Sequence, residues 1–204
     1  MAQPIKRPRL ALSGSAGVGK TTLAQALAAR WSLPYVDEGM RKRLEAGLAL
    51  HDLDREQKRH LLLELADEAY AGQQLAITAN GGFVSDRSPI DQIAFWLHYG
   101  FAQDPDEETA EVVERQIERT AIVDVVVLLP WGVLPLEDDG VRRSNSFVQL
   151  HYQALVDGLL RNFLPPDKLV VLPKDVVKLE ERIDWIEQRL GLDHHRHEAQ
   201  QQQQ

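Results

Sequence analysis

A glycine-rich turn near the start of the chain is followed by a lysine and a hydroxyl residue. Its residues match G-x-x-x-x-G-K-[ST] and are Gly14, Ser15, Ala16, Gly17, Val18, Gly19, Lys20 and Thr21. Glycines at such positions let the backbone turn its N–H groups inward, where they bind phosphate oxygens. A helix that opens at Gly19 to Thr22 would add free N–H groups and the positive end of its dipole. We therefore predict a nucleotide phosphate site in which Lys20 reaches the β- and γ-phosphates and the Thr21 hydroxyl binds Mg²⁺.

The segments on either side of this turn have the patterns of a strand and a helix. Residues 9–12 form a short apolar run before it. Apolar side chains then recur at helical spacing at Leu23, Ala26, Leu27 and Trp31. A phosphate-binding loop lies between a strand and a helix in this way, so the context supports the motif.

Two acidic residues lie at the carboxyl end of the next expected strand, at residues 33–37. They are Asp37 and Glu38, and Gly39 and Arg41 come directly after them. In open α/β sheets the ligand crevice lies at the carboxyl ends of the strands, so acids here face the phosphate site. Side chains alternate along a strand, so we expect only one of the two to point there. The alternative is a pair of solvated turn acids.

A third expected strand, at residues 83–86, ends in Asp86 and is followed by Arg87. This aspartate is the best candidate for the acid with which phosphate-loop enzymes hold Mg²⁺. The competing strand at residues 123–129 ends in Pro130 and carries no acid. We therefore expect Asp86 to be the metal-binding carboxylate.

The connection at residues 130–146 is long for a compact domain and contains Arg142 and Arg143. Connections of this length are usually functional, often as lids. Arginines on a closing lid suit a transferring phosphoryl group, because a guanidinium offers two donors and keeps its charge. The alternative is a solvated loop of mixed charge.

The remaining segments are expected to be helices that alternate with five short strands. The expected helices cover residues 40–50, 55–79, 89–99, 104–121 and 146–161 and a last segment that ends at Leu190, and the fifth strand covers residues 169–172. In the helix at 146–161, the side chains expected to face inward are Phe147, Leu150, Leu155, Leu159 and Leu160. This alternation predicts a three-layer α/β/α fold around a five-stranded parallel sheet. We expect residues 1–192 to form one domain and residues 193–204, rich in histidine and glutamine, to be disordered.

The composition limits the classes of function. The 204 residues carry a net charge of −8, which makes nucleic-acid binding unlikely because that function requires a basic face. There is no cysteine, which excludes disulfides and thiolate chemistry. No apolar stretch is long enough to span a membrane. A cytoplasmic enzyme is the expectation, and its oligomeric state is left open.

Taken together, the motifs resemble those of P-loop kinases. Within them they resemble the family that includes bacterial ribosylnicotinamide kinase domains and related AAA-type small ATP-binding proteins. The matching segments are residues 14–21, 38–41, 86–89 and 139–142. Residues 86–88 also resemble the corresponding motif of deoxynucleoside kinases. The sequence shows no arginine-finger and sensor layout of a ring-forming AAA motor.

The resemblance implies a P-loop NTPase fold and ATP-dependent phosphoryl transfer to a nucleoside or a nicotinamide-riboside-like acceptor. By it, Lys20 and the loop hold phosphates, Thr21 and Asp86 serve Mg²⁺, and either Glu38 or Asp86 takes the proton of the acceptor hydroxyl. The basic residues assigned to transition-state charge are Arg87, Arg142 and Arg143, and the one assigned to orienting the acceptor is Arg41. ATP is preferred to GTP, because no Asn-Lys-x-Asp motif is present.

Two other functions remain open at this point. One is an NTP hydrolase or nucleotide-dependent switch, in which water is the acceptor and the lid contacts a protein partner. The other is a nucleotide-binding module without catalysis. A kinase requires an acid beside an enclosed acceptor pocket, so the structure can separate these possibilities.

Overall fold

Strands and helices alternate along the chain in the computed structural model, which describes residues 7–103, 107–135 and 145–192. The strands are β1 (Arg9–Ser13), β2 (Tyr35–Val36), β3 (Phe83–Asp86), β4 (Val125–Leu128) and β5 (Leu169–Val171). The helices are α1 (Lys20–Trp31), α2 (Met40–Glu45), α3 (Arg55–Asn80), α4 (Pro89–His98), α5 (Glu107–Arg119), α6 (Ser146–Phe163) and α7 (Leu179–Leu190). Two 3-10 turns flank α5, at η1 (Phe101–Gln103) and η2 (Thr120–Ile122).

The five strands form one parallel sheet in the order β2-β3-β1-β4-β5. The central strand β1 lies between β3 and β4, with Leu12 opposite Asp86 on one side and Val127 on the other. The carboxyl ends of β1 and β3 are therefore neighbours. This register brings the glycine-rich turn that follows β1 beside Asp86 at the end of β3.

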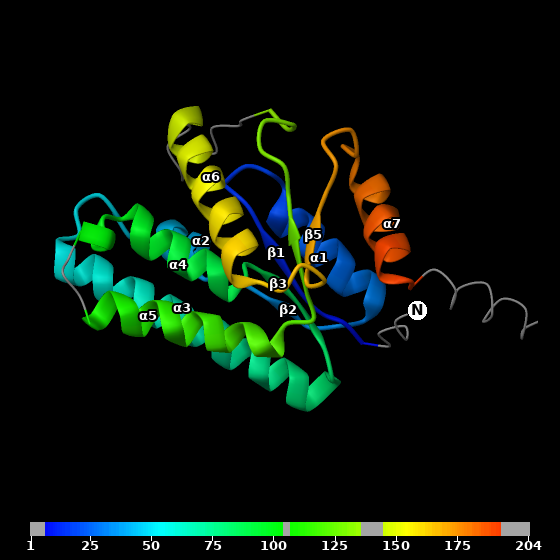
Figure 1. Cartoon of the computed structure of the whole chain (residues 1–204), viewed down its shortest axis with the longest axis horizontal. Helices are drawn as coiled ribbons and strands as arrows, with labels where there is room; N and C mark the ends of the chain where they lie inside the picture. The colour runs from blue at the N-terminus through cyan, green and yellow to red at the C-terminus, as the bar shows by residue number, and fades with distance from the viewer. Residues whose placement is uncertain (1–6, 104–106, 136–144, 193–204) are drawn as a thin grey trace, which may run out of the picture.

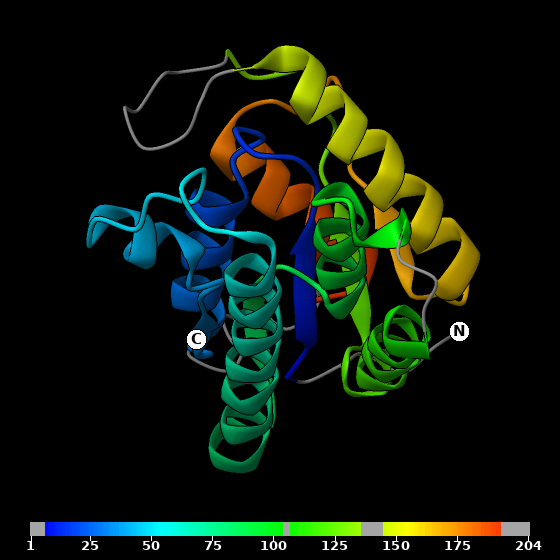
Figure 2. The same ribbon diagram turned by 90° about the vertical axis from the view of Figure 1, so that its left-hand side faces the viewer.

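The sheet is the middle layer of three, because the side chains of its central strands alternate between two cores. Leu10 and Leu12 of β1 belong to the core formed with α1 and α7. Ala11, between them, belongs to the core formed with α3, α4 and α6. Figures 1 and 2 show these two groups of helices on opposite faces of the sheet. The predicted three-layer α/β/α fold with a five-stranded parallel sheet is confirmed.

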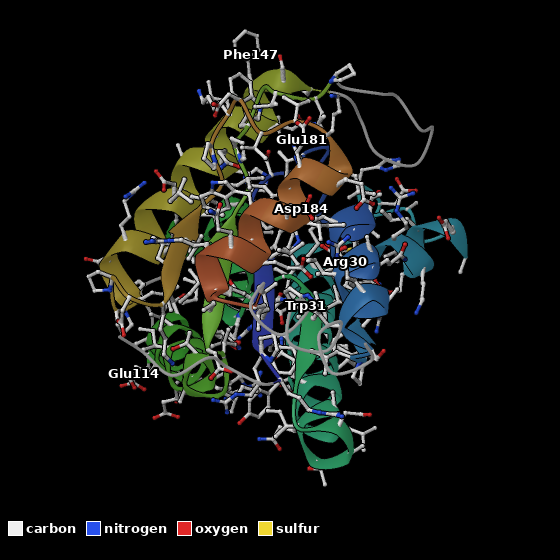
Figure 3. The ribbon with its side chains drawn as sticks, turned by 90° about the vertical axis from the view of Figure 1, so that its right-hand side faces the viewer. Arg30, Trp31, Glu114, Phe147, Glu181 and Asp184 are labelled. Carbon is white, nitrogen blue, oxygen red and sulfur yellow. The ribbon has the colours of Figure 1, made fainter. Side chains whose placement is uncertain are left out.

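The N-terminal part of α6 differs from the expected pattern. Phe147 is 80% exposed and Leu150 is 42% exposed, so the prediction that they face inward is wrong. The buried side chains of α6 are Tyr152, Val156 and Leu160, four residues apart. Figure 3 shows Phe147 at the outer end of the helix, where α6 extends past the edge of the core.

Two elements around the second strand are shorter than expected. β2 contains two residues instead of the five expected at 33–37. α2 ends at Glu45 instead of reaching residue 50, because the chain turns at Gly47, whose φ is +99°. The segment between Glu45 and α3 is therefore a loop, and it contributes Leu48 and Leu50 to a cavity described below. No described helix is both long enough and apolar enough to cross a bilayer.

Candidate active site

The glycines of the turn adopt backbone conformations that other residues rarely reach. Gly14, Gly17 and Gly19 have φ values of +134°, +77° and +87°. A Cβ atom on Gly14 would lie 3.1 Å from the Leu129 carbonyl oxygen, so this position also lacks room for a side chain. The motif glycines are therefore required by the shape of the loop.

Lys20 folds back over the loop and is buried. Its Nζ donates a hydrogen bond to the Ser15 carbonyl oxygen at 2.6 Å. Burial, and after it the nearby positive charge of Arg87, lowers the pKa of Lys20 to about 8 against the raising effect of Asp86, Glu38 and Asp91. An anion bound in the loop would stabilise the ammonium form that burial disfavours.

The other predicted loop residues have different surroundings. The Ser15 amide donates to Gln153 Oε1 of α6 at 2.8 Å, which ties the loop to that helix. Val18 is buried in the core, Ala16 lines a cavity, and Thr22 is exposed in the first turn of α1. The loop thus has a fixed backbone and one side that opens on a cavity.

Thr21 and Asp86 lie together, as the strand register requires. Thr21 Oγ1 donates to Asp86 Oδ2 at 2.5 Å. The second carboxylate oxygen, Asp86 Oδ1, is buried and has no hydrogen-bond partner among the described residues. A hydroxyl and an unsatisfied carboxylate oxygen at a phosphate-binding loop fit Mg²⁺, which usually takes one or two protein ligands together with substrate phosphates. The described residues contain no cluster of three or more histidine, aspartate or glutamate side chains suited to a metal.

Arg87 is buried at the centre of a polar cluster. Its Nε donates to Glu38 Oε2 at 2.6 Å, and its Nη1 donates to the Gly14 carbonyl oxygen at 2.8 Å and to Asp91 Oδ1 at 3.1 Å. Burial alone would lower the pKa of Arg87, but Glu38 and the other neighbours, including Asp91, raise it well above its ordinary value. The φ of Arg87 is +133°, a strained conformation that clusters at functional sites in proteins.

The two acids after β2 have different surroundings. Glu38 is buried against Arg87, whereas Asp37 forms an ion pair with Lys42 at 2.9 Å, and the Lys42 side chain is 75% exposed. Of the two, only Glu38 lines the cavity beside the phosphate loop. The acid of this pair that points toward the site is therefore Glu38. Arg41 pairs with Glu45 across one turn of α2 at 3.7 Å and is not among the residues that line the cavity.

Several residues of the polar cluster were not anticipated. Asp91 accepts hydrogen bonds from the Ser13 hydroxyl and from the Ser88 amide, and Tyr152 donates to the Asp91 carbonyl oxygen at 3.2 Å. The Arg87 guanidinium lies over the ring of Phe95, 4.7 Å from its centroid. A signal for Asp91 existed, because it lies three residues after the N-cap Ser88 and four after Arg87. Tyr152 is far away in sequence and had no such signal.

A cavity of ≈ 310 Å³ lies beside Asp37 and Lys42, but a larger one of ≈ 630 Å³ adjoins the phosphate loop. Ala16, Glu38 and Arg87 line the larger cavity at the loop. Most of the remaining lining is apolar and comes from α2 and the loop after it, α4 and α6: Met40, Leu44, Leu48, Ala49, Leu50, Phe95, Tyr99, Val148 and Tyr152. The polar groups elsewhere in the lining are His51, Lys58, His98 and Gln149. The cavity is large enough for a small metabolite.

Arg142 and Arg143 lie outside the described residues, as do residues 139–141 of the predicted lid motif. Of the expected lid at 130–146, the structure describes residues 130–135 and 145–146. Of the three arginines assigned to transition-state charge, only Arg87 is therefore among the described residues.

Solved structures with this fold include nucleotide-binding proteins. NadR protein in complex with NAD and AMP-PNP aligns with a TM-score of 0.68 and 18% identity over 91% of this chain and 50% of its own. Deoxyadenosine kinase from M. mycoides, with the products dCMP and dCDP, aligns with a TM-score of 0.63 and 12% identity over 90% and 98%. Thymidylate kinase from Candida albicans aligns with a TM-score of 0.53 and 13% identity over 92% and 93%. The chain spans about half the length of NadR.

A search of curated proteins finds no match to this sequence. The resemblance to P-loop small-molecule kinases that the motifs predict is confirmed by these shared folds. The model of a family described as an AAA domain matches residues 9–182, which include the loop, Glu38, Asp86 and Arg87. The chain belongs to this AAA domain family.

Proposed function

We propose that the chain catalyses phosphoryl transfer from ATP to a hydroxyl group of a small metabolite, a nucleoside or a nicotinamide-riboside-like molecule. One observation carries the proposal: the phosphate loop and the Glu38–Arg87 pair line the same cavity of ≈ 630 Å³. A donor held in the loop and an acceptor in the cavity would meet beside a buried carboxylate. Positioning and charge compensation of this kind are what phosphoryl transfer requires.

In this proposal the loop amides and the Lys20 ammonium bind the phosphates. Thr21 Oγ1 and Asp86 Oδ1 would hold Mg²⁺, which when bound would neutralise part of the phosphate charge. Asp86 is not among the cavity-lining residues, whereas Glu38 is. We therefore assign the acceptor proton to Glu38 and the metal to Asp86.

Arg87 has two roles in this proposal. It orients the Glu38 carboxylate through the 2.6 Å hydrogen bond, and it places a positive charge next to the Gly14 carbonyl oxygen at the edge of the loop. Because Asp91 and Tyr152 hold the guanidinium from the other side, its position is fixed before substrates bind. A preorganised charge stabilises a developing negative charge without reorganisation.

The largely apolar cavity favours a kinase over a hydrolase. A hydrolase needs room for one water molecule, whereas this cavity has a volume suited to a ring-bearing acceptor and side chains such as Phe95 and Tyr99 in its wall. No described feature distinguishes the adenine of ATP from guanine, so the preference for ATP rests on the absence of a guanine motif from the sequence.

The proposal is tested by incubating the protein with Mg-ATP and a panel of nucleosides and pyridine ribosides, and by screening for a gain of one phosphate by mass spectrometry. Phosphorylation of one class of acceptor is expected, together with ATP consumption that depends on that acceptor. An ATP hydrolysis rate that stays the same whether or not any of the acceptors is present would contradict the proposal. Lys20→Ala is the matched inactive control.

A further inference from the structure

A second buried arginine, Arg182 of α7, lies behind the phosphate loop. It is 2% exposed. Its Nη1 donates to the Val18 carbonyl oxygen at 2.9 Å, and its Nε donates to the Val176 carbonyl oxygen at 3.2 Å. Its Nη2 is buried and has no hydrogen-bond partner among the described residues.

The charge of Arg182 is not balanced in the way that the charge of Arg87 is. Arg87 forms ion pairs with Glu38 and Asp91. No carboxylate of the described residues forms an ion pair with Arg182, and burial lowers its pKa. An unpaired buried charge is costly, and the core around it is apolar, with Ile183 and Ile186 on the same helix. The hydrogen bonds to two backbone carbonyl oxygens satisfy part of the guanidinium but leave its charge unpaired, so this charge requires another explanation.

The contact with Val18 suggests that explanation. The Val18 carbonyl and the Gly19 N–H belong to one planar trans peptide group and point in opposite directions. A hydrogen bond that draws the carbonyl toward α7 therefore turns the Gly19 N–H away from α7. Gly19 has a φ of +87°, and a Cβ there would lie 3.1 Å from Arg182 Nη1, so the close approach depends on glycine.

We propose that Arg182 is a positioning residue for the phosphates of the bound nucleotide. It holds the Val18–Gly19 peptide with its N–H facing the phosphate position, and it places behind the loop a positive charge that the polyphosphate compensates. The inference rests on the proposed function only in that the loop binds a nucleoside di- or triphosphate. It is independent of the acceptor.

The test compares Arg182→Met with a control that disturbs the same helix away from the loop. Arg30 of α1 forms ion pairs with Asp184 at 2.8 Å and Glu187 at 3.0 Å on α7, and Figure 3 shows α1 and α7 side by side there. Arg30→Met loosens the contact between α1 and α7 without removing a hydrogen bond to the loop. The dissociation constant of Mg-ADP is measured by calorimetry for each variant, and the melting temperature is measured without nucleotide.

Arg182→Met is expected to weaken Mg-ADP binding about tenfold to a hundredfold, as loss of a charge-assisted hydrogen bond does. Arg182→Lys keeps the charge and one donor, so it should recover part of the affinity, and Arg30→Met should bind as the parent does. The lysine variant carries the test if the methionine variant does not fold.

Parental affinity in Arg182→Met, or in Arg182→Lys when that variant carries the test, would overturn the inference. An equal loss in Arg30→Met would also overturn it, because the docking of α7 would then be responsible. A parent protein that fails to bind Mg-ADP would overturn the proposed function itself, and this outcome is visible before any variant is made.

Discussion

The two ends of the cavity are built differently. At the phosphate end, short backbone segments at the carboxyl ends of β1 and β3 hold the polar groups, and hydrogen bonds fix Lys20, Thr21 and Arg87. At the other end, the walls come mainly from helices and loops, and most of their side chains are apolar. In the proposed function, the first region binds the phosphates. The second determines the choice of acceptor, because its side chains can change without disturbing the sheet.

The largest effect is expected from substituting, one at a time, the two acids at the phosphate end. Glu38→Gln should retain Mg-ATP binding and lose phosphoryl transfer by about 10²- to 10⁴-fold, because it removes the proton acceptor. Asp86→Asn should instead raise the Mg²⁺ concentration needed for nucleotide binding. Both variants are titrated with Mg²⁺ while ATP binding and product formation are followed separately.

The fold should survive the first of these changes. The amide oxygen of a glutamine at position 38 can still accept from Arg87 Nε, and Asp91 still pairs with the guanidinium at 3.1 Å. If Glu38→Gln transferred phosphate at close to the parental rate, the base would lie elsewhere and the assignment of Glu38 would be wrong.

The second effect concerns the charge inside the loop. Lys20→Ala should weaken Mg-ATP binding about a hundredfold, because a buried charge-assisted contact to phosphate is lost. Thermal shift with and without Mg-ATP measures this. Lys42→Ala is the matched control, since Lys42 is a mostly exposed lysine that pairs with Asp37. Equal stabilisation of Lys20→Ala and the parent by nucleotide would contradict the placement of Lys20.

The sequence could predict the phosphate end because its residues are close together in the chain or follow strands directly. The glycines, Lys20, Thr21 and Asp86 needed only the motif and the rule that ligands bind at the carboxyl ends of strands. Glu38 was left as one of two acids, and only the structure distinguishes them, because Glu38 is buried against Arg87 whereas Asp37 pairs with the mostly exposed Lys42.

The end of the cavity away from the phosphate loop, where the proposed acceptor would bind and which we call the acceptor end, could not be predicted in the same way. Tyr152 and Phe95 meet at a ring-centroid distance of 4.9 Å although they lie on α6 and α4, and no local pattern joins them. Helical periodicity also placed Phe147 and Leu150 inward, whereas the buried face of α6 begins at Tyr152. Periodicity shows that a helix has an apolar face, but how far the core extends along the helix depends on tertiary packing.

A third effect, of about tenfold, follows from the pKa of Lys20. In the free protein burial lowers that pKa to about 8, and phosphate binds the ammonium form. At pH 9 about one-tenth of the free protein carries the ammonium, so Mg-ADP should bind about tenfold more weakly than at pH 7. Binding at pH 9 should also take up a proton, which calorimetry in buffers of different ionisation enthalpy detects. Unchanged affinity from pH 7 to pH 9 would contradict this.

The Lys20 contribution to the stability of the nucleotide-free protein should rise with pH, whereas the affinity for nucleotide falls. The folded pKa of about 8 lies below the ordinary value of 10.5, so between these pH values the folded protein binds fewer protons than the unfolded chain. The Lys20 contribution to stability therefore rises with pH across this window. Chemical denaturation of the parent and of Lys20→Ala from pH 7.5 to pH 9.5 isolates that contribution as the difference between the two.

The smallest effect sharpens the description of the acceptor end. Glu38 and Arg87, at the phosphate end, offset each other's charge, which leaves Lys58 as a positive group in the wall of the cavity. Burial lowers the pKa of His98 at the acceptor end, as does its neighbour His151. A lysine disfavours a cationic acceptor such as nicotinamide riboside relative to a neutral nucleoside. In a water-filled cavity one such charge at about 4 Å changes binding by about 1 kcal/mol, or about fivefold.

Lys58→Met should therefore raise kcat/KM for nicotinamide riboside about twofold to fivefold and leave that for a neutral nucleoside unchanged. Steady-state kinetics with both acceptors at low salt measures the ratio, since salt screens the interaction. Lys42→Met should leave the ratio unchanged, because Lys42 does not line this cavity. A parallel change for both acceptors in Lys58→Met would mean that the lysine acts through packing. The charge of Lys58 would then have no effect on acceptor choice, which would depend on the shape of the apolar walls alone.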